Sequence, residues 1–235
     1  VVTTNFDCLI EQAMQTLLQP QYSPQAVIRK TEFQRYSHEL ADHQHNPFTV
    51  IKLHGSPRNW FTQDNTKTTV ITTLDTISTE KDEGQQIFSL PTYKQKVLRS
   101  LAQDRTVIVM GYAGGDSFDV MPELQQIAGM RRLVWIDHDA TAQTPATWQK
   151  TWYNPDDSSP SRKTSKLRDF LQQTSRLRGI RVLHLKAHTG SYLQYLTSQM
   201  LSSDWDGAGA VQTPRKSHST FPEWLSAHFD SPDQL

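Results

Sequence analysis

The chain has 235 residues, 36% of them hydrophobic and 20% charged, which is enough for one large domain or for one domain with a small insertion. Its 24 basic and 24 acidic side chains give a formal net charge of zero, so no global field favours binding to nucleic acid or to an anionic membrane. The single cysteine, Cys8, excludes an internal disulfide framework and a cysteine zinc site, and no apolar run approaches the roughly 20 residues of a membrane-spanning helix.

Strand and helix signals alternate through the first half of the chain. Apolar and β-branched runs predict strands at 1–4, 26–28 and 48–53, and apolar residues at helical spacing predict a helix at 9–18. Because no glycine-rich turn precedes the first strand, we expect the chain to be truncated and to continue a segment upstream of Val1. Residues 31–46 are polar, and a solvated loop is expected there rather than a metal site made by His38, His43 and His45.

The alternation sharpens in the second half of the chain. A loop is expected at 57–66 and an exposed or edge strand at 68–73. The elements expected after it are a helix at 88–102, a strand at 106–110, a helix at 118–128, a strand at 133–136, a helix at 165–177, a strand at 180–185 and a helix at 190–201. Residues 140–162 are rich in Thr, Pro, Ser and Asp, so they are expected to form a surface excursion.

Strands that alternate with helices, and that are apolar on both faces, predict an α/β fold. We expect a Rossmann-like, mostly parallel sheet with helices on both faces and a small inserted subdomain at about 57–103. The predicted domain covers residues 1–203, and the Gly-, Pro- and Ser-rich residues 204–235 are expected to be a linker or a C-terminal tail.

Polar side chains follow the first and the third predicted strands. Asn5 and Asp7 can orient a polar ligand or an ordered water, or they can simply cap the helix that follows. His54 can act as a general base near neutral pH, or it can be hydrogen-bonded within a turn. Gly55 allows the backbone to approach a ligand closely.

A glycine-rich turn joins the strand at 106–110 to its helix. Gly111, Tyr112 and Asp116 belong to this turn, where amide groups can face a phosphate or a ribose at a helix N-terminus. It is not a clean GxGxxG pattern. Asp137 ends the next strand, where a carboxylate can bind a ribose hydroxyl or can be a solvated strand end.

Four stretches together resemble the sirtuin-like (SIR2-like) superfamily, and most closely its zinc-free branch found in bacterial antiphage defence proteins. These are TTNFD at 3–7, KLHGS at 52–56, VIVMGYAGGD at 107–116 and VWIDHD at 134–139. The resemblance implies that Asn5 and His54 are the catalytic asparagine and histidine, and that Asp7 holds the nicotinamide pocket. It also implies a set of NAD-binding residues, which are Thr4, Phe6, Gly55, Gly111, Tyr112, Asp116 and Asp137.

The chain departs from the family pattern in three places. The first glycine-rich turn of the family is absent, and so are the two CxxC pairs of the sirtuin zinc ribbon, so we expect no zinc. Ala113 stands where many members have Ser. A later stretch, Gly190-Ser191-Tyr192, is similar to the family's loop near adenine only over a short motif.

The resemblance implies an NAD⁺ glycohydrolase that releases nicotinamide and ADP-ribose, as a toxic effector within a larger antiphage protein. Two alternatives stay open, namely an NAD-dependent protein deacylase and a non-catalytic module that senses NAD or ADP-ribose. NAD is expected as the substrate, with further domains of the same chain and a possible homo-oligomer as partners. We expect a cytoplasmic location, because a single cysteine suits a reducing compartment and no signal peptide is visible.

Overall fold

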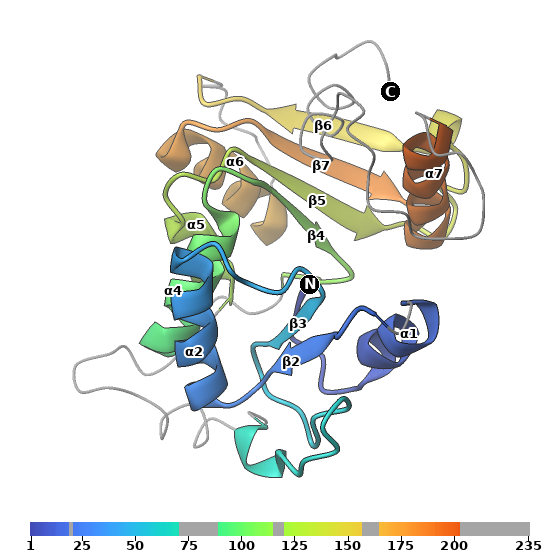
Figure 1. Cartoon of the computed structure of the whole chain (residues 1–235). Helices are drawn as coiled ribbons and strands as arrows, with labels where there is room; N and C mark the ends of the chain where they lie inside the picture. The colour runs from blue at the N-terminus through green and yellow to red at the C-terminus, as the bar shows by residue number, and fades with distance from the viewer. Residues whose placement is uncertain (19–20, 71–88, 115–119, 157–164, 203–235) are drawn as a thin grey trace. The chain divides into compact units, whose positions relative to one another are not determined.

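The computed structural model describes residues 1–18, 21–70, 89–114, 120–156 and 165–202 (Figure 1). The chain divides into two compact units, the first made of residues 1–101 with 116–124 and the second of residues 102–115 with 125–235. Both units are built from parallel strands and helices, so the chain has the predicted α/β class with mostly parallel strands. The described strands fall into two hydrogen-bonded sheets, one in each unit.

The sheet of the first unit has three parallel strands in the order β1-β3-β2. These strands are β1 (Val2–Thr3), β2 (Gln25–Val27) and β3 (Thr49–Lys52), as the sequence predicted. All four residues of β3 are buried, because it is the central strand and is covered on both faces. Helix α1 (Leu9–Leu17) follows β1 at the predicted place.

Helix α2 (Lys30–Ala41) occupies most of the segment for which a polar loop was expected, so that prediction was wrong. Glu32 starts the helix, because its Oε2 accepts hydrogen bonds from the backbone N–H groups of Ile28 and Arg29 at 2.7 and 2.9 Å. The buried side chains of α2 recur at helical spacing, and the Phe33 ring packs edge-on against Tyr93, with ring centroids 5.5 Å apart.

The remaining elements of the first unit differ from the predictions in small ways. Residues 67–69 form a single 3₁₀ turn rather than the start of an edge strand, and 71–73 lie outside the described residues. Helix α4 (Thr92–Ala102) begins directly after Pro91, which suits the first turn of a helix. Helix α5 (Val120–Gln126) falls within the helix expected at 118–128.

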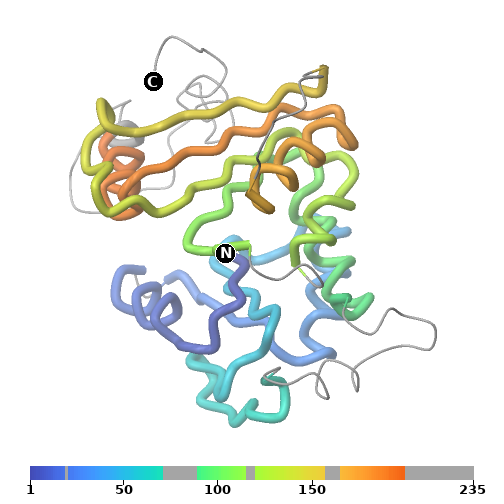
Figure 2. The backbone as a smooth tube through the Cα atoms, turned by 180° about the vertical axis from the view of Figure 1, so that it is seen from behind, coloured from blue at the N-terminus to red at the C-terminus, as the bar shows by residue number. Residues whose placement is uncertain are grey.

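The sheet of the second unit has four strands in the order β4-β5-β7-β6 (Figure 2). Strands β4 (Thr106–Met110), β5 (Arg132–His138) and β7 (Val182–Ala187) are parallel and lie where strands were expected. Strand β6 (Gln149–Tyr153) pairs antiparallel with β7, so the expected surface excursion at 140–162 contains an edge strand.

Helices α6 (Lys166–Arg178) and α7 (Thr189–Ser202) cover opposite faces of this sheet. The contacts of β5 show this, because successive side chains of a strand point to opposite faces. Trp135 packs edge-on against Phe170 of α6, with ring centroids 5.9 Å apart. Its neighbours Val134 and Ile136 belong instead to the apolar cluster that includes Tyr192 of α7. None of the helices in the described part of the chain is long and apolar enough to cross a membrane.

Candidate functional site

Strand pairing brings Asn5 and His54 to the same edge of the first sheet. Thr3 of β1 pairs with Lys52 of β3, and Leu53 N donates a hydrogen bond to Thr3 O at 2.9 Å. Asn5 and His54 each follow this pair by two residues, and both strands point the same way. The two predicted catalytic residues therefore leave the sheet together at its carboxyl edge, where parallel α/β sheets bind ligands.

The segment after β1, residues 4–8, is called the β1–α1 loop here. Asn5 is exposed, and its backbone N–H is anchored by the Thr3 hydroxyl at 3.1 Å. Asp7 is also exposed, and its Oδ1 accepts a hydrogen bond from Leu9 N at 3.1 Å. Asp7 precedes the N-cap residue Cys8, so it is not the N-cap itself, but its carboxylate satisfies the first N–H of α1 and stays accessible at the loop.

His54 is half-buried, and its ring centroid lies 6.3 Å from that of Phe6 in the β1–α1 loop. Gly55 follows with φ of +79°, a conformation that favours glycine. A Cβ on Gly55 would lie 2.0 Å from the carbonyl oxygen of Thr69. The backbone after His54 thus passes the 3₁₀ turn at a distance that only glycine allows.

The loop after Gly55 closes back on its own start. Ser56 O accepts hydrogen bonds from the Thr66 hydroxyl at 2.6 Å and the Thr69 hydroxyl at 3.4 Å. Asn59 N donates to Asp64 O at 2.9 Å nearer the tip. We call residues 57–66 the closed loop, because its two ends meet beside His54.

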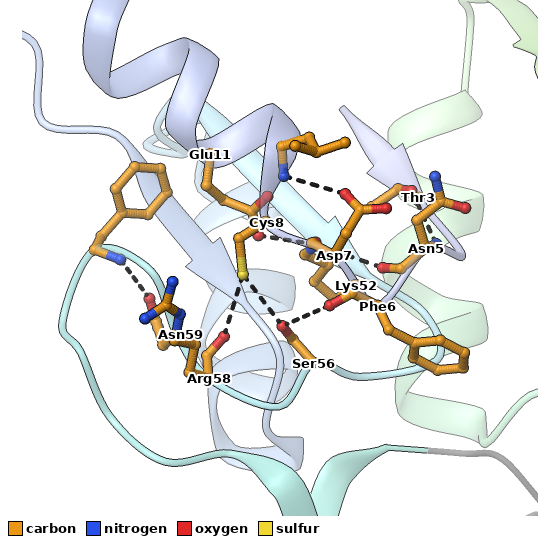
Figure 3. A network of polar contacts seen from close by, with 12 residues as sticks. Thr3, Asn5, Phe6, Asp7, Cys8, Glu11, Lys52, Ser56, Arg58 and Asn59 are labelled. Atoms are coloured by element: carbon orange, nitrogen blue, oxygen red, sulfur yellow. Dashed lines mark hydrogen bonds and ion pairs between the residues drawn. The ribbon is translucent and has the colours of Figure 1, made fainter.

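The side chains of Lys52, Glu11 and Ser56 form a network that holds the β1–α1 loop in place (Figure 3). The Lys52 ammonium lies 2.9 Å from Oε1 of Glu11, and it also donates to the carbonyl oxygens of Asn5 and Asp7. The Ser56 hydroxyl donates to Phe6 O at 3.2 Å and lies 3.8 Å from the Cys8 sulfur. None of Lys52, Glu11 and Ser56 was predicted as a functional residue. The sequence held one sign of this role, because Lys52 is a charged residue inside the otherwise apolar run before His54.

A cavity of about 420 Å³ opens between the β1–α1 loop and the closed loop. This volume lies within the range of small-molecule sites, roughly 300–1,000 Å³. One wall contains the predicted residues Phe6 and Asp7. The full lining is Phe6, Asp7, Cys8 and Gln12 on one side and Pro57, Arg58, Gln63, Asn65 and Lys67 on the other.

Three of the other predicted residues, Gly111, Tyr112 and Asp137, belong to the second unit. Gly111 is exposed with φ of +68°, directly after β4, and the Tyr112 ring lies 5.8 Å from that of Trp135. Asp137 Oδ2 lies 3.6 Å from Nε2 of His184, which is a charge contact rather than a hydrogen bond. Asp116 lies outside the described residues.

Two details of the second unit qualify the sequence-based assignments. Burial lowers the pKa of His184, and the neighbouring Asp137 carboxylate opposes this effect. Tyr192, from the stretch that is similar to an adenine loop, is only 1% exposed and packs edge-on against Trp148. Its ring is therefore a core side chain.

One known protein family matches the part of the chain that carries the predicted site residues. The model of one family, described as SIR2-like domain, matches residues 1–174 of the chain. All of the predicted site residues fall within this range. The comparisons with curated proteins and with solved structures gave no significant match. Among the described residues, no three His, Cys, Asp or Glu side chains gather into a group that could hold a metal ion.

Proposed function

The chain belongs to the SIR2-like domain family, and from this membership we propose that it hydrolyses NAD⁺ to nicotinamide and ADP-ribose. SIR2-like domains are in general NAD-dependent enzymes. One observation carries the finer proposal. Asn5 and His54 emerge side by side from paired parallel strands, and the β1–α1 loop, which carries Asn5, borders a cavity of about 420 Å³ through Phe6, Asp7 and Cys8.

The proposed reaction breaks the bond between the ribose C1′ and the nicotinamide nitrogen. The bonding electron pair moves to the pyridinium ring, so nicotinamide leaves as a neutral molecule. The exposed Asn5 amide orients a water whose oxygen forms the new bond to C1′, and His54 accepts the proton that this water loses. The net change is NAD⁺ and water to nicotinamide, ADP-ribose and one proton.

Other residues of the site have binding roles in this proposal. The accessible Asp7 carboxylate fixes the carboxamide of the substrate, and Thr4, Phe6 and Gly55 line the site beside it. The resemblance to the family also assigns NAD-binding roles to Gly111, Tyr112, Asp116 and Asp137.

The experiment is a measurement of NAD⁺ consumption with product analysis for the parent protein, Asn5→Ala and His54→Ala. Both variants are expected to lose at least about 100-fold in turnover, since a positioned base contributes about 10²–10⁴-fold. His38→Ala, an exposed histidine on α2, serves as the matched control and keeps parent activity. A fully active Asn5→Ala or His54→Ala protein would contradict the assignment.

The same assay separates the alternative activities. Nicotinamide release that requires an acetyl-lysine peptide indicates a deacylase. NAD binding without any turnover indicates a sensing module. A strand-end histidine beside the asparagine speaks against a sensing module, because a pure binding site has less need of a base. The peptide requirement then decides between hydrolase and deacylase.

We further propose that this activity serves antiphage defence in the cytoplasm, as one NAD-binding domain of a longer, self-associating protein. The support is the likeness of TTNFD and LHG to the zinc-free defence branch. Plaque counts on cells that carry the full-length protein or its Asn5→Ala variant test this role. Protection that survives the substitution would contradict it.

A further inference from the structure

We propose that Lys52, Glu11 and Ser56 are positioning residues that hold the β1–α1 loop, and with it Asn5, in register with His54. This inference rests on the proposed function, because it concerns the same site. All three side chains are almost fully buried, and Lys52 and Ser56 donate to backbone carbonyl oxygens of the loop, so each acts through the loop backbone rather than on the substrate.

The contacts form a continuous clamp (Figure 3). The carbonyl oxygens of Asn5, Phe6 and Asp7 each accept a hydrogen bond from a side chain of residues 52–56. Lys52 supplies the first and third of these bonds, and Ser56 supplies the second. His54 lies in the middle of the same segment, so the clamp ties the asparagine side of the site directly to the histidine side.

The Lys52 ammonium is almost completely removed from water, with 1% of its side chain exposed. Burial of an ammonium requires that its three N–H donors find acceptors. The two loop carbonyls accept hydrogen bonds from it, and Glu11, which is 0% exposed, supplies the counter-charge 2.9 Å away. The counter-charge comes from α1 and the carbonyls from the loop that precedes it, so Lys52 links β3 to both.

Stability alone does not account for this arrangement. Removing two charges from water costs free energy that can exceed the gain from their attraction. A buried ion pair can therefore often be replaced by apolar residues without loss of stability. An apolar pair at these positions cannot bond the carbonyls of Asn5 and Asp7. What the ion pair adds is a fixed direction for the Asn5–Phe6 and Asp7–Cys8 peptide groups, and therefore for the Asn5 side chain.

The test compares the parent with the double variant Lys52→Met/Glu11→Leu, which removes both charges at once. Single substitutions are avoided because each leaves one buried charge without a partner. The double variant is expected to keep a parent-like melting temperature and to lose about 100-fold in kcat, since a small displacement of a catalytic group costs about 10²-fold. KM for NAD⁺ is expected to change far less than kcat.

The control is a second double variant, Arg99→Met/Glu123→Leu, which removes an ion pair of the same unit away from the loop. It is expected to keep the parent kcat. Ser56→Ala is a milder probe of the clamp that removes only the donor to Phe6 O, and about a tenfold loss in kcat is expected for it.

A readout independent of catalysis is hydrogen–deuterium exchange of residues 4–9. Exchange there is expected to accelerate at least about tenfold in the clamp variants, with α2 and the strands of the second unit unchanged. Parent-like kcat and parent-like exchange in Ser56→Ala and in the folded double variant would overturn the inference. If the parent itself shows no NAD⁺ turnover, the proposed function fails, and the exchange measurement alone decides whether the clamp exists.

Discussion

Gly55 shows at the scale of one residue how the fold protects the site. Its φ is +79°, and an added Cβ would meet the carbonyl oxygen of Thr69 at 2.0 Å, where backbone rather than a flexible side chain would have to move. Either the 3₁₀ turn at 67–69 or the peptide that carries His54 must shift if this glycine is replaced.

We therefore expect Gly55→Ala to lower the free energy of unfolding by more than the roughly 1–3 kcal/mol of conformational strain alone. Gly179→Ala is the matched control, because Gly179 has φ of +64° and no atom within 4 Å of the Cβ position. Chemical unfolding curves of the two variants measure the difference. Equal losses would show that the contact with Thr69 does not matter.

The residues that carry motifs could be predicted from the sequence, and those that support them could not. Asn5 and His54 were found because their types and strand-end positions suggest chemistry. Glu11 was missed because nothing in a helical pattern shows that a glutamate is buried. Its partner Lys52 lies on another element, so the pair becomes visible only when β3 is placed beside α1.

Helix α2 shows at the scale of an element why composition misled the prediction. Its polar and histidine-rich surface suggested a loop, but Phe33, Tyr36 and Leu40 recur every three to four residues and form one buried face. Only these three positions carry the apolar pattern, which is too sparse to stand out among exposed residues. The contact that anchors this face is made with Tyr93 of α4, which is distant in the sequence.

This face predicts a sharp contrast between neighbouring substitutions. Phe33 is 0% exposed, so Phe33→Ala is expected to cost about 3–5 kcal/mol of unfolding free energy. The adjacent Gln34 is exposed, and Gln34→Ala is expected to change stability by no more than about 0.5 kcal/mol. Denaturant titration compares them. A small effect of Phe33→Ala would mean that α2 is not anchored through this face.

Strand β6 was missed for a related reason. Its sequence, Gln149 to Tyr153, has the aromatic and β-branched residues that strands favour, but Pro, Ser and Asp surround it. An edge strand needs only one pairing partner, and here that partner is β7. The sequence of β6 alone does not show that β7 is the strand with which it pairs.

At the scale of the whole molecule, the order of motifs predicted the family and the α/β class. The motifs follow strands, and parallel strands that alternate with helices are the common frame of such sites. The division of the strands into two sheets could not be predicted, because hydrogen-bond pairing between distant strands leaves little trace in their individual sequences. The pairing of β1 with β3 is the exception that matters, since it unites Asn5 with His54.

The formal net charge is zero at pH 7 with neutral histidines, so near neutral pH the pH dependence of stability comes from individual groups rather than from overall repulsion. Burial lowers the pKa of His184 below its ordinary value of 6.5, so the unfolded chain binds this proton first. The contribution of His184 to stability is therefore complete above about pH 6.5 and is lost as the pH falls through its depressed folded pKa.

We expect the melting temperature of the parent to decline below about pH 6.5 and His184→Gln to flatten that decline. His38→Gln, which changes an exposed histidine of α2, is expected to keep the parent profile. Thermal unfolding between about pH 5 and pH 8 provides the measurement. A parent-like slope in His184→Gln would assign the acid sensitivity to other groups.

The closed loop at 57–66 allows the choice of ligand to vary independently of the proposed catalytic histidine. Its ends are fixed to each other beside His54, so we expect changes at its tip to leave the histidine in place. Yet the same loop supplies one wall of the cavity, through residues that include Arg58 and Gln63. Substitutions at these positions are therefore expected to change which molecules the cavity binds without moving the histidine.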